Sequence, residues 1–80
     1  MTDEQFLSTF VDAIDNLSPG DVTCETRLKD IRAWDSLALL NLLSCLEVDY
    51  GIELSGREIA DCVTIGDVAQ KARAKLASQQ

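Results

Sequence analysis

The chain has 80 residues, enough for one core of three or four helices and too few for two lobes that enclose an active site, so we expect residues 1–80 to form a single domain. Hydrophobic residues make up 46% of the chain and charged residues 26%, which is typical of a folded globular protein. Fourteen acidic residues against seven basic ones leave a net charge of −7. This charge repels phosphate backbones and attracts basic protein surfaces, so we expect protein partners and no nucleic acid.

The three cysteines are Cys24, Cys45 and Cys62, an odd number with no close pair in a chain that lacks histidine. Neither a disulfide framework nor a zinc site is expected from them, and free cysteines usually behave as small buried hydrophobic residues. The sequence contains no signal peptide and no apolar run long enough to cross a bilayer. We therefore expect no metal, no membrane span and a cytoplasmic location.

The first predicted element is an amphipathic helix that starts at Thr2 and Gln5, which form a capping-box pattern. Its apolar residues recur at helical spacing and are Phe6, Leu7, Phe10, Val11 and Ile14. Ser18-Pro19-Gly20 is expected to end it. No periodicity is sustained from Asn16 to about Trp34, and a connector of that length in a small domain is usually functional or anchored. Leu28 and Ile31 are the expected anchors.

The second predicted helix runs from about Ser36 to Tyr50 and is stopped by Gly51, just past its end. One face carries the expected core residues Leu39, Leu42, Leu43, Leu46 and Tyr50, and a second face carries Leu37, Leu40, Ser44 and Val48. The second face either wraps further into the core or docks a partner, because exposed apolar surface on a small monomer commonly marks an interaction site. If it docks a partner, Asp35, Glu47 and Asp49 form an acidic rim for basic residues of that partner.

Two more helices are predicted after the link from Gly51 to Ser55. Ser55 and Glu58 form a capping box before a brief helix over Arg57 to Asp61, and Thr64 and Asp67 form another before the last helix. The inward-facing residues of the last helix are Ile65, Val68, Ala69, Ala72 and Leu76. The tail, residues 77–80, is expected to fray. With no period-2 stretch and no internal repeat, the predicted fold is an all-α bundle of four helices, three main ones and one short one.

Asp35 and Ser36 compete for the N-cap of the second helix. If Ser36 is the cap, its hydroxyl accepts a hydrogen bond from the first turn and the residue is structural, which is the commoner role of a serine at a helix start. If Asp35 is the cap, Trp34 and Leu39 can form a hydrophobic staple, and the Ser36 hydroxyl is free at the first helical position. The second register accounts for more residues. A phosphate on the free oxygen would lie over unpaired N–H groups at the positive end of the helix.

The chain carries no catalytic constellation around Ser36. It has no histidine, no second residue arranged as a base and no visible oxyanion hole, all of which acyl transfer by a serine needs. No catalytic residue is therefore predicted, and any reaction at Ser36 must be performed by another protein.

The run WDSLALLNLLSCLEVDYGIELSGREIADCVTIGDVA resembles the acyl carrier proteins and the related peptidyl carrier proteins over nearly the whole chain. The family hallmark is D-S-L at the start of the second helix, matched by Asp35, Ser36 and Leu37. Further matches are Glu47, Tyr50, the GIELS link at residues 51–55 and the T-I-x-D-V opening at residues 64–68. The D-S-L tripeptide alone is common, but together with the downstream matches at the expected spacing it is fairly specific for this family.

The resemblance implies a right-handed four-helix bundle with a long first loop. It also implies that Ser36 receives 4′-phosphopantetheine from coenzyme A through a separate, magnesium-dependent phosphopantetheinyl transferase, with Asp35 orienting the serine or the metal. The thiol of this arm would carry acyl or aminoacyl groups as thioesters between a loading enzyme and a downstream synthase or transferase in fatty-acid, polyketide or related biosynthesis. Partner recognition would fall on Leu37, Leu40, Glu47 and Val48 of a monomeric carrier.

Two departures from the common family pattern favour a specialised pathway over housekeeping fatty-acid synthesis. Acidic residues usually follow D-S-L in the fatty-acid type, whereas this chain has Ala38 and Asn41. A glycine usually precedes the motif, whereas this chain has Ala33 and Trp34. The tryptophan serves either as the staple against Leu39 or as a partner contact.

The second functional hypothesis is an unmodified, carrier-like adaptor that docks a partner enzyme through Leu37, Leu40 and Val48. A stand-alone enzyme is disfavoured because the chain lacks a catalytic constellation. If an attached acyl chain is sheltered by the protein, we expect it to enter between the second and third helices near Leu46, Ile59 and Ile65.

Overall fold

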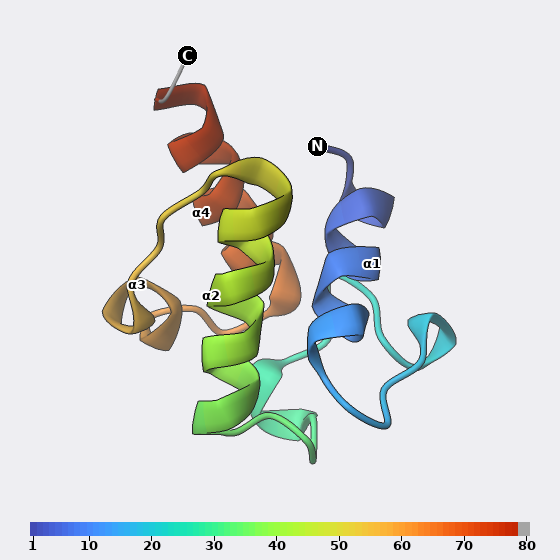
Figure 1. The fold of residues 1–80 in the computed structure, drawn as a ribbon. Helices are drawn as coiled ribbons and strands as arrows, with labels where there is room; N and C mark the ends of the chain where they lie inside the picture. Colours follow the sequence, from blue (N-terminus) through green and yellow to red (C-terminus); the bar gives the residue numbers. More distant parts are fainter. Residues whose placement is uncertain (79–80) are drawn as a thin grey trace.

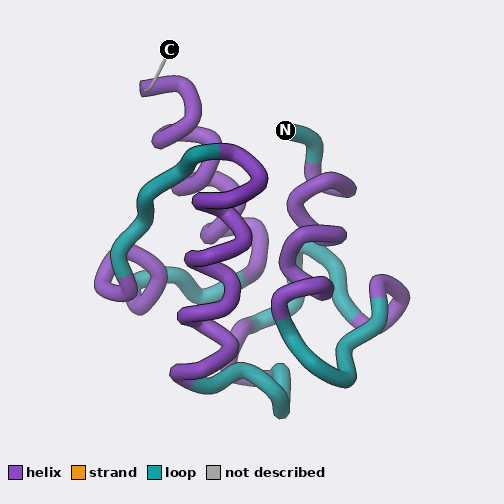
Figure 2. The backbone as a smooth tube through the Cα atoms, in the orientation of Figure 1, coloured by secondary structure: helices purple, strands orange, loops and turns teal. Residues whose placement is uncertain are grey.

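The computed structural model describes residues 1–78 as a bundle of four α-helices whose long first connector contains two short 3₁₀ turns. The helices are α1 (Asp3–Ala13), α2 (Ser36–Tyr50), α3 (Gly56–Ala60) and α4 (Ile65–Ser78), and the turns are η1 (Pro19–Asp21) and η2 (Leu28–Asp30). In Figure 1, α1 and the short α3 lie on opposite sides of α2, and α4 lies behind it. Figure 2 shows only helix and loop in the described residues, so the all-α prediction is confirmed.

One hydrophobic core joins all four helices. Its most deeply buried large side chains are Phe6, Phe10, Leu42, Leu46, Ile52, Ile59, Ile65 and Val68. Most of these were predicted from helical spacing, whereas Ile52 lies in a link that has no period to reveal it. Leu39, Leu43 and Tyr50 are only half-buried at the edge of the core. Within residues 1–78, no helix is both long and apolar enough to span a membrane.

The predicted helix caps are confirmed, but several helix ends are not where the sequence placed them. All three capping boxes form, at Thr2, Ser55 and Thr64, and Gly51 ends α2 in the left-handed conformation. The brief helix α3 lies one residue earlier than predicted at both ends. Ala77 and Ser78 remain within α4, so fraying was wrong for them, and the rest of the tail, residues 79–80, lies outside the described residues.

The first helix ends at Ala13, before the Ser18-Pro19-Gly20 breaker that was expected to end it. Ile14 already has an extended backbone, with φ −121° and ψ 123°. Asn16 then takes a left-handed conformation with φ 65°, which asparagine tolerates better than most residues. The chain thus leaves the helix at Ile14, Asn16 lies in the turn that follows, and Pro19 starts the separate turn η1.

The connector between α1 and α2 is anchored by buried side chains and by backbone pairing. Leu28 and Ile31 are buried as predicted, and Val22 is a third buried anchor that the sequence did not indicate. Backbone hydrogen bonds also join this connector to the α3–α4 link, from Leu28 N–H to Val63 O (2.9 Å), from Ile65 N–H to Thr26 O (3.0 Å) and from Gly66 N–H to Cys24 O (2.8 Å). The connector is thus held at a fixed place beside the start of α2.

Candidate functional site

Asp35 caps the N-terminus of α2. Its backbone is extended, with φ −146° and ψ −172°, and its Oδ1 accepts a hydrogen bond from the Ala38 N–H at 2.8 Å. The Asp35 carbonyl oxygen accepts another from the Leu39 N–H at 3.0 Å. These bonds confirm the register in which Asp35, and not Ser36, is the cap.

Ser36 is therefore the first residue of α2, and its side chain is exposed. Its hydroxyl forms no hydrogen bond with any other residue of the described chain. The first N–H groups of a helix have no partner inside the helix. Asp35 accepts the hydrogen bonds of two N–H groups in this first turn, those of Ala38 and Leu39. The N–H groups of Ser36 and Leu37 remain open to solvent or a ligand at the positive end of the helix, so the residues present fit a phosphate on the Ser36 oxygen.

Trp34 braces the start of α2 against α1. Its ring stacks on the buried Phe10, with a centroid separation of 5.5 Å and an interplanar angle of 17°. The backbone N–H of Trp34 donates to the Ile31 carbonyl at 3.0 Å. Trp34 and its predicted staple partner, Leu39, both line a cavity that opens beside Ser36. The ring supports the helix start from the inside, and its main aromatic contact lies on α1, which the sequence did not indicate.

A cavity of about 510 Å³ opens beside Ser36 between η2, the start of α2 and α3. This Ser36 cavity is lined by Leu28, Leu39, Ile59 and Val63, and by charged residues at its edge. Its volume is in the range of small-molecule sites, about 300–1,000 Å³. Of the residues predicted to shelter a cargo chain, only Ile59 lines it. Leu46 and Ile65 are fully buried in the core, and the entry of a cargo chain near these residues stays a prediction.

The second face of α2 is an exposed strip formed by Leu37, Leu40, Ser44 and Val48. Leu37 is 66% exposed, Leu40 is 59% exposed and Val48 is 84% exposed, and the neighbouring Glu47 is exposed as well. The strip therefore does not wrap into the core, which was the open alternative. Val63 is a further exposed apolar residue that the sequence did not indicate, and it lies at the Ser36 cavity.

The two residues that stand where the fatty-acid type has acids, Ala38 and Asn41, occupy different environments. Ala38 is buried in the core, whereas Asn41 is exposed. Only Asn41 therefore changes the charge of the α2 surface. The first turn of α2 carries no acidic side chain, as the sequence indicated.

Cys62 also lines the Ser36 cavity. Burial is the main cause that raises the pKa of its thiol, and its Sγ donates to the Glu58 carbonyl at 3.6 Å. Burial likewise raises the pKa of Cys24 and of Cys45. All three thiols are therefore protonated at neutral pH and weakly nucleophilic. No group of three or more histidine, cysteine or acidic residues in residues 1–78 could hold a metal ion.

A family model described as the phosphopantetheine attachment site matches residues 5–71. The matched segment contains Ser36, the whole exposed strip and every residue that lines the Ser36 cavity. Members of this family carry covalently attached 4′-phosphopantetheine, work with a phosphopantetheinyl transferase and other partner enzymes, and are generally carriers without catalytic activity of their own. Since the match covers most of the chain, this protein belongs to the phosphopantetheine-attachment family and is a phosphopantetheine-carrying protein of the acyl carrier type.

Proposed function

We propose that Ser36 is the residue that carries the arm, and that the protein presents acyl or aminoacyl thioesters to partner enzymes in fatty-acid, polyketide or related biosynthesis. The observation that supports this most directly is the free, exposed hydroxyl of Ser36 at the first position of α2. Asp35 supports it indirectly, because its side chain takes the capping role that would otherwise occupy the serine.

The modification forms a bond between the Ser36 oxygen and phosphorus and breaks the pyrophosphate bond of coenzyme A, releasing adenosine 3′,5′-bisphosphate. We assign the base that takes the proton of the hydroxyl to the transferase, because this chain has no histidine and no base of residues 1–78 is hydrogen-bonded to the Ser36 hydroxyl. Once bound, the arm supplies a thiol that holds an acyl group as a thioester. The residues of this chain position and present it.

The exposed strip and Glu47 are the proposed docking surface for the transferase, the loading enzyme and the downstream synthase. Leu37 and Leu40 lie closest to Ser36 along α2, and Val48 with Glu47 lies toward its C-terminus. The first turn of α2 contains no acidic residue, and its acids are Glu47 and Asp49 near the other end. This distribution supports a specialised pathway. The monomeric state, the single domain and the cytoplasmic location stay predictions.

The experiment that tests the attachment residue is intact-mass spectrometry. We expect the unmodified protein, incubated with coenzyme A, magnesium and a broad-specificity phosphopantetheinyl transferase, to gain the mass of one phosphopantetheine. Ser36→Ala should abolish the gain, whereas Ser44→Ala, a matched change of an exposed serine on the same helix, should keep it. No gain by the wild type, or a gain that survives Ser36→Ala, contradicts the proposal.

A second candidate is favoured by the exposed strip itself: an adaptor that docks a partner enzyme without being modified. It predicts that the unmodified protein and Ser36→Ala bind a partner enzyme equally tightly and that Leu40→Glu abolishes that binding in both. If the protein is a carrier, Leu40→Glu instead lowers kcat/KM for loading by the transferase. The thermal stability of Leu40→Glu should stay close to that of the wild type, because the replaced side chain is exposed.

A further inference from the structure

The helix α3 has only five residues, Gly56–Ala60, and needs contacts from outside itself to stay folded. Helices shorter than about 12 residues are marginally stable in water, because starting a helix is costly and few hydrogen bonds follow. Ile59 is the one residue of α3 that is buried. The capping box of Ser55 and Glu58 satisfies two N–H groups at its start. The partners of the carbonyl groups at its other end are therefore important for its stability.

A lysine of α4 supplies one of these partners. The last carbonyl groups of a helix have no N–H partner inside the helix. The Cys62 N–H, which would bond to the Glu58 carbonyl if α3 continued, bonds to the Ile59 carbonyl at 2.9 Å instead. The Glu58 carbonyl accepts a hydrogen bond from Lys71 Nζ at 2.6 Å. Because a cation is favourable at the negative end of a helix dipole, Lys71 acts as a C-terminal cap that one helix provides to another.

Lys75, one turn further along α4, contacts the same residue in a different way. Its Nζ lies 3.4 Å from the Glu58 Oε1, and both side chains are partly exposed. An ion pair of this kind contributes little to stability. Lys71 bonds to the main chain of α3, whereas Lys75 pairs with a side chain. The two lysines have the same charge on the same helix, so Lys75 is a matched control for Lys71.

One wall of the Ser36 cavity is formed by α3 and the residues that follow it. The residues of this wall are Ile59, Ala60, Cys62 and Val63. Lys71 and Lys75 line a separate cavity of about 360 Å³ and not the Ser36 cavity. The two lysines therefore hold α3 from outside the Ser36 cavity, and the wall is in place only while α3 is folded.

We propose that the Lys71 contact controls whether α3 is folded, and that losing it unfolds α3 and removes this wall while α1, α2 and α4 remain folded. The other three helices each contribute at least two of the most deeply buried side chains of the core, whereas α3 contributes Ile59 alone. Proteins unfold locally where few apolar side chains are buried. The inference does not depend on what Ser36 carries.

Hydrogen exchange of backbone amides, measured by NMR on the unmodified wild type, tests whether α3 unfolds separately. The amides of Ile59 and Cys62 are bonded within α3 and at its end, and Leu42 is fully buried on α2. We expect Ile59 and Cys62 to exchange at least about tenfold faster than Leu42. Their exchange should also respond less to urea at about 1 M, because unfolding a short helix exposes little surface.

The variant Lys71→Met tests the cap, because methionine keeps an apolar stem and lacks the ammonium group. We expect it to speed the exchange of Ile59 and Cys62 about tenfold, the order expected from losing one hydrogen bond to a charged group. Lys75→Met should speed their exchange by at most about threefold, because it removes an exposed ion pair.

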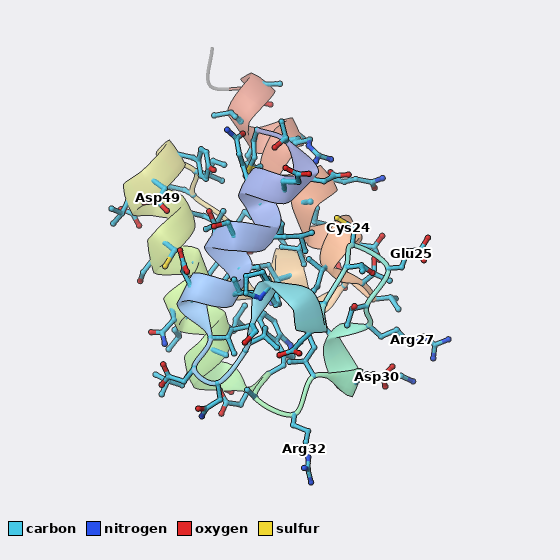
Figure 3. The ribbon with its side chains drawn as sticks, turned by 90° about the vertical axis from the view of Figure 1, so that its right-hand side faces the viewer. Cys24, Glu25, Arg27, Asp30, Arg32 and Asp49 are labelled. Atoms are coloured by element: carbon cyan, nitrogen blue, oxygen red, sulfur yellow. The ribbon has the colours of Figure 1, made fainter. Side chains whose placement is uncertain are left out.

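Alkylation of the three thiols by iodoacetamide, followed by peptide mass spectrometry, reports on the wall itself. Burial raises the pKa of the Cys62 thiol and the Lys71 charge lowers it, so removing the charge alone would slow alkylation. Loss of the wall exposes the thiol, so we expect Lys71→Met to speed alkylation of Cys62 at least about twofold. Cys45 on α2 and Cys24 should keep their rates. Figure 3 shows Cys24 on the connector, on the opposite side of the molecule from Asp49 of α2.

Four results would overturn the inference. The first is exchange of Ile59 and Cys62 no faster than that of Leu42 in the wild type, because α3 then unfolds only with the whole domain. The second is unchanged exchange in Lys71→Met, and the third is an equal acceleration in Lys75→Met. The fourth is unchanged or slower alkylation of Cys62 in Lys71→Met. All measurements use unmodified protein, so a failure of the proposed attachment at Ser36 leaves them interpretable.

Discussion

Replacing Asp35 tests how this protein keeps its serine free. In Asp35→Ala, the hydrogen bond from the Ala38 N–H to Oδ1 is lost, and so is a negative charge at the positive end of α2. Loss of an N-cap costs about 1 kcal/mol, and the charge contributes about 0.3–1 kcal/mol more. Since 1 kcal/mol shifts the Tm of a domain of this size by about 4–8 °C, we expect Tm to fall by about 5–15 °C.

Asp35→Asn separates the two contributions. The asparagine side chain keeps an oxygen that can accept the bond from Ala38, and asparagine is as good an N-cap as aspartate. Only the charge contribution is lost, so we expect Tm to fall by less than half as much as in Asp35→Ala. Circular dichroism melts of both variants at one salt concentration measure the difference.

Asp35→Ala should also change the role of Ser36. Without the aspartate, the adjacent hydroxyl can take over the cap by moving the helix start along by one residue, which occupies the oxygen needed for modification. We therefore expect slower loading by the transferase in Asp35→Ala. In a double-mutant cycle, Ser36→Ala should cost almost no stability in the wild type and about 1 kcal/mol in the Asp35→Ala background. A Tm unchanged in Asp35→Ala, or an equal cost of Ser36→Ala in both backgrounds, would refute the reasoning.

Two further predictions concern the connector and the last helix. A β-carbon at Gly66 would lie 2.9 Å from the Cys24 carbonyl oxygen, so Gly66→Ala should lower the free energy of unfolding by about 1–3 kcal/mol, measured by urea titration. A β-carbon at Gly20 would have nothing within 4 Å, so the control Gly20→Ala should change the free energy of unfolding by under about 0.5 kcal/mol. Hydrogen bonds from the Thr64 and Val63 N–H groups hold the pKa of Asp67 below its ordinary 3.8, and one from Ser55 holds the pKa of Glu58 below 4.5. The two carboxylates stabilise the folded state fully when the pH is above their ordinary pKa values. This stabilisation is lost as the pH falls through their lower pKa values in the folded state, so Tm should decline between about pH 5 and pH 3. Asp67→Asn should flatten that decline, and an equally steep decline in Asp67→Asn contradicts the assignment.

The helix starts could be predicted from the sequence because each cap involves residues at most four positions apart. Asp35, Ser55 and Thr64 all cap the helices that the pattern indicated. The end of α1 could not be predicted in the same way. Asn16 and Pro19 can both end a helix, but the chain already leaves the helix at Ile14, which is extended and buried in the core.

The candidate site was only partly predictable. The positions of Ser36 and of the exposed strip follow from the periodicity of one helix. The Ser36 cavity does not, because its walls come together through pairing between the connector and the α3–α4 link. That pairing joins backbone groups, which leave no periodic pattern in the side chains.

By itself, the sequence determined the helical class and the capping boxes at Thr2, Ser55 and Thr64, because these depend on contacts within a few positions of one another. The tertiary structure decided that Asp35 leaves Ser36 unbonded, that the strip of Leu37, Leu40 and Val48 stays outside the core, and that Trp34 packs on Phe10. Each of these outcomes depends on which distant segments share one small core, and that follows from the way the whole chain packs.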